Sequence, residues 1–137
     1  MHPILRNVLA VIAGLLVGGS VNMAIVTLGP MIIPPPEGAD VTTMEGLLES
    51  IHLFEPQHFI SPFLAHALGT LVGAWLAAMI AVSHRSKLAI GVGAFFLIGG
   101  VMNVMMLPSP MWFNALDLIV AYIPMGWLGG KMAARRK

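Results

Sequence analysis

The run LAIGVGAFFLIGGVMNVMML at residues 88–107 carries no charged side chain. A helix of roughly 20 apolar residues can cross the hydrocarbon core of a bilayer, because it satisfies its backbone hydrogen bonds internally. Further apolar runs occupy residues 4–30, 59–82 and 112–130. The sequence therefore predicts an all-α, polytopic membrane protein, a four-transmembrane-helix bundle in which residues 1–137 form a single membrane domain.

The composition favours the same class of protein. The chain is 58% hydrophobic and 9% charged, whereas a soluble domain is about 25% charged. It has no cysteine, which excludes thiol redox chemistry, iron–sulfur clusters and thiolate zinc sites. No charge pattern indicates nucleic-acid binding, and the partner that the composition does imply is the lipid bilayer.

Charged residues fall on two opposite sides of the predicted spans. The basic side chains lie at the start of the first span, between the second and third, and after the fourth: Arg6, Arg85, Lys87, Lys131, Arg135, Arg136 and Lys137. The acids gather in the loop at 34–57: Glu37, Asp40, Glu45, Glu49 and Glu55. Since cytoplasmic segments are rich in Lys and Arg, we expect both termini in the cytoplasm and the loop on the extracytoplasmic side.

This loop carries a helical pattern of its own. Thr42 followed by Glu45 is typical of a capping box. Apolar side chains then recur at helical spacing, at Met44, Leu47, Leu48 and Ile51. The pattern predicts a short amphipathic extracytoplasmic helix at the outer membrane surface. A solvated acidic loop is the alternative.

Small residues and prolines predict the shapes of the spans. Gly14 and Gly18 stand four apart, as do Gly69 and Gly73, a spacing that lets helix backbones approach closely. Pro30 follows a glycine and is expected to end the first helix early. Pro124 is expected to kink the fourth span and to free the carbonyl of Val120.

Two pairs of segments match each other within the chain. LVGGSVN at 16–22 parallels LIGGVMN at 97–103, and SPFLAHALG at 61–69 parallels SPMWFNALD at 109–117. The order and direction are the same in both copies. This predicts two duplicated helix hairpins, a parallel 2+2 repeat, although Gly, Leu, Val and Ala are common in spans and chance similarity is the alternative.

Strongly polar side chains inside the predicted spans mark the candidate ligand-binding residues: His66, Asn103, Asn114, Asp117 and Asn22. A charge at the centre of a span costs about 2.5–3.5 kcal/mol on insertion scales. In the proposed repeat Asn22 matches Asn103, His66 matches Asn114, and Asp117 replaces a glycine. The pattern predicts a polar pocket open to the extracytoplasmic side; hydrogen bonds that only join helices are the alternative.

His66 and Asp117 are expected to pair. His66 is the only histidine inside a predicted span. A shared proton or an ion pair would lower the cost of burying the two side chains. They are also the only candidates for catalytic residues.

The pattern H-x2-E-x2-H at His52, Glu55 and His58 is a candidate metal site. Imidazole and carboxylate suit Zn²⁺ or a similar divalent metal ion, and this ion is the only cofactor that the sequence suggests. Pro56 interrupts the run, so the three residues do not share a regular helix. Interfacial histidines bonded to water and lipid headgroups are the alternative.

Three segments carry a resemblance to known sequences: PPPEG at 34–38, HLFEPQHF at 52–59 and HALGTLVGA at 66–74. With them, nearly the whole chain resembles a group of small four-span bacterial membrane proteins that have no assigned activity. The resemblance implies a location in the bacterial inner membrane. It implies no reaction.

The sequence supports three functional hypotheses. The first is an extracytoplasmic-facing pocket that binds a small or lipidic ligand, a cation or protons, in a transporter or channel. Because a bundle of four spans is thin for a conduction path, we expect a homo-oligomer or a partner membrane protein. The second is an accessory subunit of a larger membrane complex. The third is an intramembrane enzyme with His66 as general base, oriented by Asp117.

Overall fold

The protein is a bundle of helices, described by a computed structural model over residues 1–135. In chain order its elements are α1 (Pro3–Ile32), α2 (Met44–Ser50), the 3₁₀ turns η1 (Ile51–Leu53) and η2 (Pro56–Phe59), α3 (Ile60–Ile80), α4 (Arg85–Met106), α5 (Met111–Val120) and α6 (Ile123–Arg135). Four helical segments are long and apolar enough to cross a membrane: Pro3–Ile32, Pro56–Ile80, Arg85–Met106 and Met111–Arg135. The prediction of an all-α protein with four helical segments long and apolar enough to cross a membrane is therefore confirmed.

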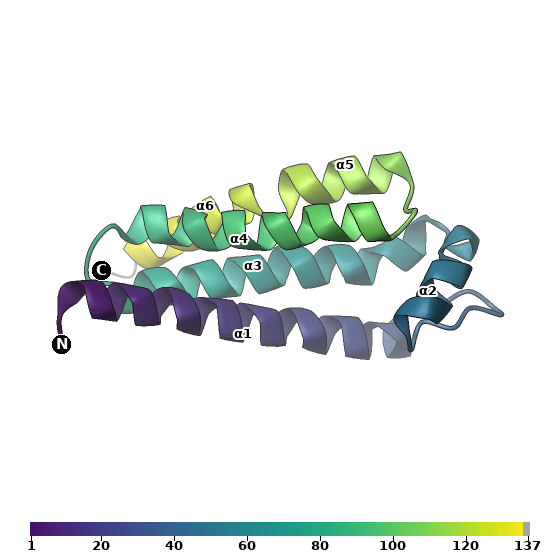
Figure 1. Cartoon of the computed structure of the whole chain (residues 1–137), viewed down its shortest axis with the longest axis horizontal. Coiled ribbons are helices and arrows are strands. Elements are labelled where there is room, and N and C mark those ends of the chain that lie inside the picture. Colours follow the sequence, from purple (N-terminus) through teal and green to yellow (C-terminus); the bar gives the residue numbers. More distant parts are fainter. Residues whose placement is uncertain (136–137) are drawn as a thin grey trace.

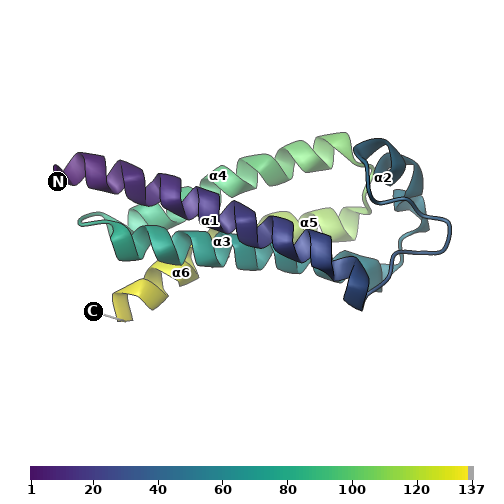
Figure 2. The ribbon, with the colours of Figure 1, turned by 90° about the horizontal axis from the view of Figure 1, so that it is seen from below.

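Helix α3 is the centre of the bundle. α1 packs mainly on α3, and α4 and α6 pack against both α3 and each other. The chain begins and α6 ends at one end of the bundle, whereas α2 lies across the other, here called the α2 end (Figure 1). α1 crosses α3 obliquely, so that α1 and α4 diverge toward the α2 end (Figure 2). The candidate site is lined by residues of α1, α3 and α4 together with Tyr122.

Glycines allow α1 and α3 to touch backbone to backbone. A Cβ atom added to Gly14 would lie 2.5 Å from the carbonyl oxygen of Gly73, and one added to Gly18 would lie 2.6 Å from that of Gly69. Inside lipid there is little hydrophobic drive between helices, so close packing of small residues stabilises their association. The four-residue spacing of these glycines correctly predicts this contact, which we call the glycine seam.

Helix α1 continues past Pro30, and the predicted early end is wrong. It runs to Ile32, and the amide of Ile33 donates to the carbonyl of Gly29 at 2.9 Å. A proline removes one donor and costs little in the last turn, where few further helical bonds follow. The carbonyl of Val26 consequently lacks its usual donor four residues later. With 30 residues, α1 is about 45 Å long, longer than the hydrocarbon core of roughly 30 Å.

The sequence predicts a kink in the fourth span at Pro124. The structure shows a break at this position, which divides the span into α5 and α6. α5 ends at Val120 and α6 begins at Ile123. Pro124 has no amide hydrogen for the carbonyl of Val120, and the ladder resumes where the amide of Gly126 donates to the carbonyl of Tyr122 at 2.8 Å. The break lies within the bundle and turns Tyr122 toward the interior.

The loop helix α2 starts at a different cap from the one predicted. Thr43, not Thr42, is the N-cap, and its hydroxyl accepts from the amide of Gly46 at 3.0 Å. Of the four predicted apolar positions, Ile51 is buried against Phe59 and Phe113, while Met44 and Leu48 are exposed. The short helix therefore exists, but its apolar positions do not form one buried face.

At the end opposite α2, Asn7 ties the start of α1 to the turn between α3 and α4. Its amide nitrogen donates to the hydroxyl of Ser83 at 2.8 Å, and its oxygen accepts from the backbone of Val82 at 3.0 Å. Beside it, Arg6 donates to the carbonyl of Ile80 at 2.9 Å.

Replacing Asn7 by alanine should lower the free energy of unfolding by about 1–2 kcal/mol, because two hydrogen bonds are lost at a half-buried position. Unfolding in mixed detergent micelles measures this change. Ser83→Ala removes only one of the bonds and should cost less. Equal effects of the two substitutions would show that the Val82 bond does not contribute.

Candidate functional site

His66 of α3 and Asp117 of α5 form a hydrogen-bonded pair in the interior of the bundle. His66 Nδ1 lies 2.8 Å from Oδ1 and 3.0 Å from Oδ2 of Asp117. The Asp117 side chain is 5% exposed and that of His66 is 17% exposed. A carboxylate can only accept, so Nδ1 carries the proton in this arrangement. The structure thus brings together the two residues whose pairing the sequence predicts.

Tyr122 adds a third member that the sequence analysis missed. Its hydroxyl donates to Asp117 Oδ2 at 3.1 Å, and its ring stacks on that of His66 with centroids 5.8 Å apart. Asp117 therefore receives hydrogen bonds from both neighbours, which offsets the cost of burying a carboxylate. The signal was present, because Tyr122 is the only tyrosine in the chain and lies two residues before the proline that breaks the span.

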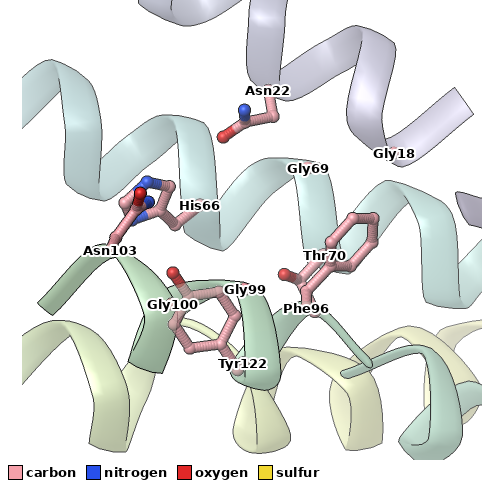
Figure 3. A pocket seen from close by; sticks show the side chains of 10 residues that line it. All are labelled: Gly18, Asn22, His66, Gly69, Thr70, Phe96, Gly99, Gly100, Asn103 and Tyr122. Atoms are coloured by element: carbon pink, nitrogen blue, oxygen red, sulfur yellow. The ribbon is translucent and has the colours of Figure 1, made fainter. Parts of the chain in front are cut away.

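A cavity of about 160 Å³ lies beside this pair, between α1, α3, α4 and the α5–α6 break. Asn22 reaches it from α1, Asn103 from α4, His66 and Thr70 from α3, and Tyr122 from the break (Figure 3). Asp117 lies behind His66 and does not line the cavity. We call this space the inner cavity.

His66 Nε2 is the free end of the pair. Among the hydrogen bonds of residues 1–135, none joins Nε2 to another protein group, and His66 lines the inner cavity. A histidine held at Nδ1 by a carboxylate presents Nε2 in a fixed direction. It can accept a hydrogen bond when neutral and donate one when protonated. The cavity therefore contains one group able to bind and release a proton, flanked by the amides of Asn22 and Asn103.

Asn114 is not part of this constellation, although the sequence predicts it as a ligand-binding residue. Its side-chain amide donates to the carbonyl of Ser109 at 3.3 Å, near the start of α5. That position is one helical turn from Asp117, outside the residues that line the inner cavity. The contact stabilises the turn between α4 and α5, which explains the polar residue without a ligand.

The predicted metal ligands do not converge. His58 Nδ1 accepts from the backbone amide of Glu55 at 2.8 Å, and the Glu55 carboxylate accepts from Gln57 at 3.1 Å. The first of these interactions belongs to the cap of η2. Within the part of the chain that the structure describes, no three His, Asp or Glu side chains are placed to hold a metal ion. Capping of η2 accounts for Glu55 and His58, and the structure does not bring His52, Glu55 and His58 together as metal ligands.

Comparison with known proteins found no matching family, no matching curated protein and no matching solved structure. The resemblance to small four-span bacterial proteins stays a prediction.

Proposed function

We propose that this chain is an inner-membrane protein that binds the polar group of a small or lipidic ligand in the inner cavity and exchanges a proton with it through His66. The observation that carries the proposal is the fixed His66–Asp117 pair with Nε2 left free beside that cavity. An ionisable pair is expensive inside a membrane, and such pairs commonly belong to substrate or proton pathways. A purely structural link between α3 and α5 would not need an adjoining cavity.

The chemistry follows from the charge on the pair. When His66 is neutral, the Asp117 carboxylate behind it leaves the pair with a net negative charge, so a cation or a proton entering the cavity is favoured. When Nε2 takes a proton, the pair becomes neutral overall and this attraction is lost. Asn22 and Asn103 each supply a donor and an acceptor for the remaining polar atoms of the ligand.

We propose that the α2 end faces the extracytoplasmic side. The acids of the 34–57 loop lie at that end, while Arg6, Arg85 and Lys87 lie at the other, as the distribution of basic residues in membrane proteins favours. The exposed side chains of Met44 and Leu48 suit contact between α2 and the outer membrane surface. Both termini are then cytoplasmic.

The proposed duplication gains support from the cavity. Gly18 and Asn22 of α1 match Gly99 and Asn103 of α4 in the two similar segments, and all four line the inner cavity. Two copies of one hairpin would place such residues across a common axis. Transport through so small a bundle would require a second copy of the chain, and we include a homo-oligomer in the proposal.

The ligand can be sought by native mass spectrometry of the protein released from native membranes. We expect the wild type to retain a molecule that His66→Ala loses, because that substitution removes Nε2 from the cavity. Asn114→Ala is the matched control and should retain it. Loss from neither variant would contradict binding at His66, and a stoichiometric larger protein would instead favour an accessory subunit.

A second candidate, an intramembrane enzyme, is favoured by the same pair, because a carboxylate-oriented imidazole is a general base. In residues 1–135 no hydroxyl is hydrogen-bonded to Nε2, so the base would have to act on water or on the substrate itself. Recovery of a chemically altered ligand from the wild type, but not from His66→Ala, would favour this candidate over simple binding.

A further inference from the structure

A second and larger cavity lies nearer the α2 end. Its volume is about 480 Å³, and it is formed by the end of α1, the start of α3 and the loop that joins them. We call it the outer cavity. Val26 lines it one helical turn beyond Asn22, and Pro62 lines it one turn before His66. Residues four apart share a helix face, so the outer cavity follows the inner one along both helices.

The wall of the outer cavity is mostly apolar, with hydrogen-bond acceptors at a few points. Val26, Leu47 and Phe54 supply apolar surface, and Thr27 and Ser61 supply hydroxyls. Val26 also carries the carbonyl that loses its helical donor at Pro30. A volume of this size lies in the range of pockets that hold small organic molecules, about 300–1,000 Å³. Its contents would be an apolar body with a polar end.

Asp40 is held firmly at the rim of this cavity. Its backbone amide donates to the hydroxyl of Ser50 at 3.0 Å, and its Oδ1 accepts from the hydroxyl of Thr42 at 2.6 Å and from the Thr42 amide at 3.0 Å. Those bonds from Thr42 hold the pKa of Asp40 below its usual value. The carboxylate has room because residue 46 is glycine: a Cβ there would lie 2.8 Å from Oδ2.

The other ionisable group of the wall is His58. Its Nδ1 accepts from the amide of Glu55, so in this arrangement the ring is neutral and its proton is on Nε2. No Lys or Arg is among the residues that line the outer cavity. The fixed charge at the cavity is therefore negative, and Phe54 adds an aromatic ring of the kind that attracts organic cations.

We propose that the outer cavity is a binding site for an amphipathic organic cation, an apolar body that carries one ammonium or phosphonium group, with the charge near Asp40. The apolar wall accommodates the body, and the lining residues Asp40, Thr27 and Ser61 supply the carboxylate and the hydroxyls for the charged end. This proposal does not depend on proton exchange at His66, because none of its contacts involves the inner cavity.

The test is equilibrium binding of tetraphenylphosphonium to the full chain in nanodiscs of phosphatidylcholine, with protein-free nanodiscs as the lipid background. We expect saturable binding of tetraphenylphosphonium. Tetraphenylborate, the anion of the same shape, should not displace it. Asp40→Asn should raise the Kd about fivefold, the upper range for an exposed ion pair, while its Oδ1 still accepts from Thr42. Glu37→Gln removes the same charge from the same loop outside the cavity and should leave the Kd unchanged.

Two further variants test whether the cation binds in the outer cavity. Leu47→Trp should reduce binding by filling the cavity without changing its charge, and His66→Ala should not affect it. Absence of saturable binding to the wild type, or an equal Kd for Asp40→Asn and the wild type, would overturn the proposal. Competition by tetraphenylborate would show an apolar site without charge selection, and loss of binding only in His66→Ala would place the cation in the inner cavity.

Discussion

Replacing Gly14 by valine should separate α1 from α3 and lower the free energy of unfolding by about 3 kcal/mol, the upper range for overpacking a tight contact. The new Cβ would lie 2.5 Å from the carbonyl oxygen of Gly73 and 3.0 Å from the Cβ of Ala77. The nearer atom belongs to the backbone of a packed helix and cannot rotate away. Unfolding in mixed micelles, followed by tryptophan fluorescence, measures the loss.

The same helix offers a matched control. A Cβ at Gly19 would meet nothing within 4 Å, so Gly19→Val makes the same chemical change on the same helix without a clash. It should leave the stability close to that of the wild type. If both variants lost the same free energy of unfolding, the cause would be the glycine-to-valine change itself, and close packing at the glycine seam would not contribute to the stability.

Replacing Asp117 by asparagine should reduce proton-coupled uptake into vesicles about 100-fold, the lower range for the loss of a positioned proton-transfer group, because His66 loses the carboxylate that orients it. Asparagine has nearly the same shape and can still accept one hydrogen bond. It carries no charge to balance a protonated His66. The measurement is substrate-dependent acidification of vesicles that hold the reconstituted protein, using the ligand recovered with the wild type.

The effects of two other substitutions on uptake serve as comparisons for Asp117→Asn. Tyr122→Phe removes one hydrogen bond of 3.1 Å to the same carboxylate and should cost about fivefold, the equivalent of about 1 kcal/mol. Asn114→Ala lies on the same helix and should have no effect on uptake. Undiminished uptake by Asp117→Asn would exclude proton coupling through the pair.

The fold was largely predictable because lipid imposes a simple rule on sequence. A span must be long and apolar, so hydropathy identified the four helices even though no contact was known. The boundary errors come from local backbone chemistry. Pro30 lies close enough to the end of α1 for the helix to continue, and Thr43 rather than Thr42 has its hydroxyl within reach of the Gly46 amide.

The site was predictable only in part. His66 and Asp117 stood out because ionisable residues in spans are rare, and that scarcity made their pairing a strong expectation. Tyr122 was missed because its role depends on the break after Val120, which rotates the chain in a way that no spacing rule describes. The metal pattern at His52, Glu55 and His58 was ambiguous from the sequence, because residues that cap a short 3₁₀ turn, as Glu55 and His58 do, can have the spacing of metal ligands.

The link between α3 and α5 also has a consequence for how the chain is assembled. His66 is synthesised in the second span and Asp117 in the fourth, so the pair cannot form in a nascent chain until the fourth span has entered the membrane. The fourth span also has the lowest mean hydropathy of the four, 1.3 against 1.8 to 2.2 for the others. Before the fourth span inserts, His66 lacks its carboxylate partner inside the membrane, which costs free energy. The His66–Asp117 pair therefore stabilises chains whose fourth span has inserted relative to chains whose fourth span has not, with or without a ligand.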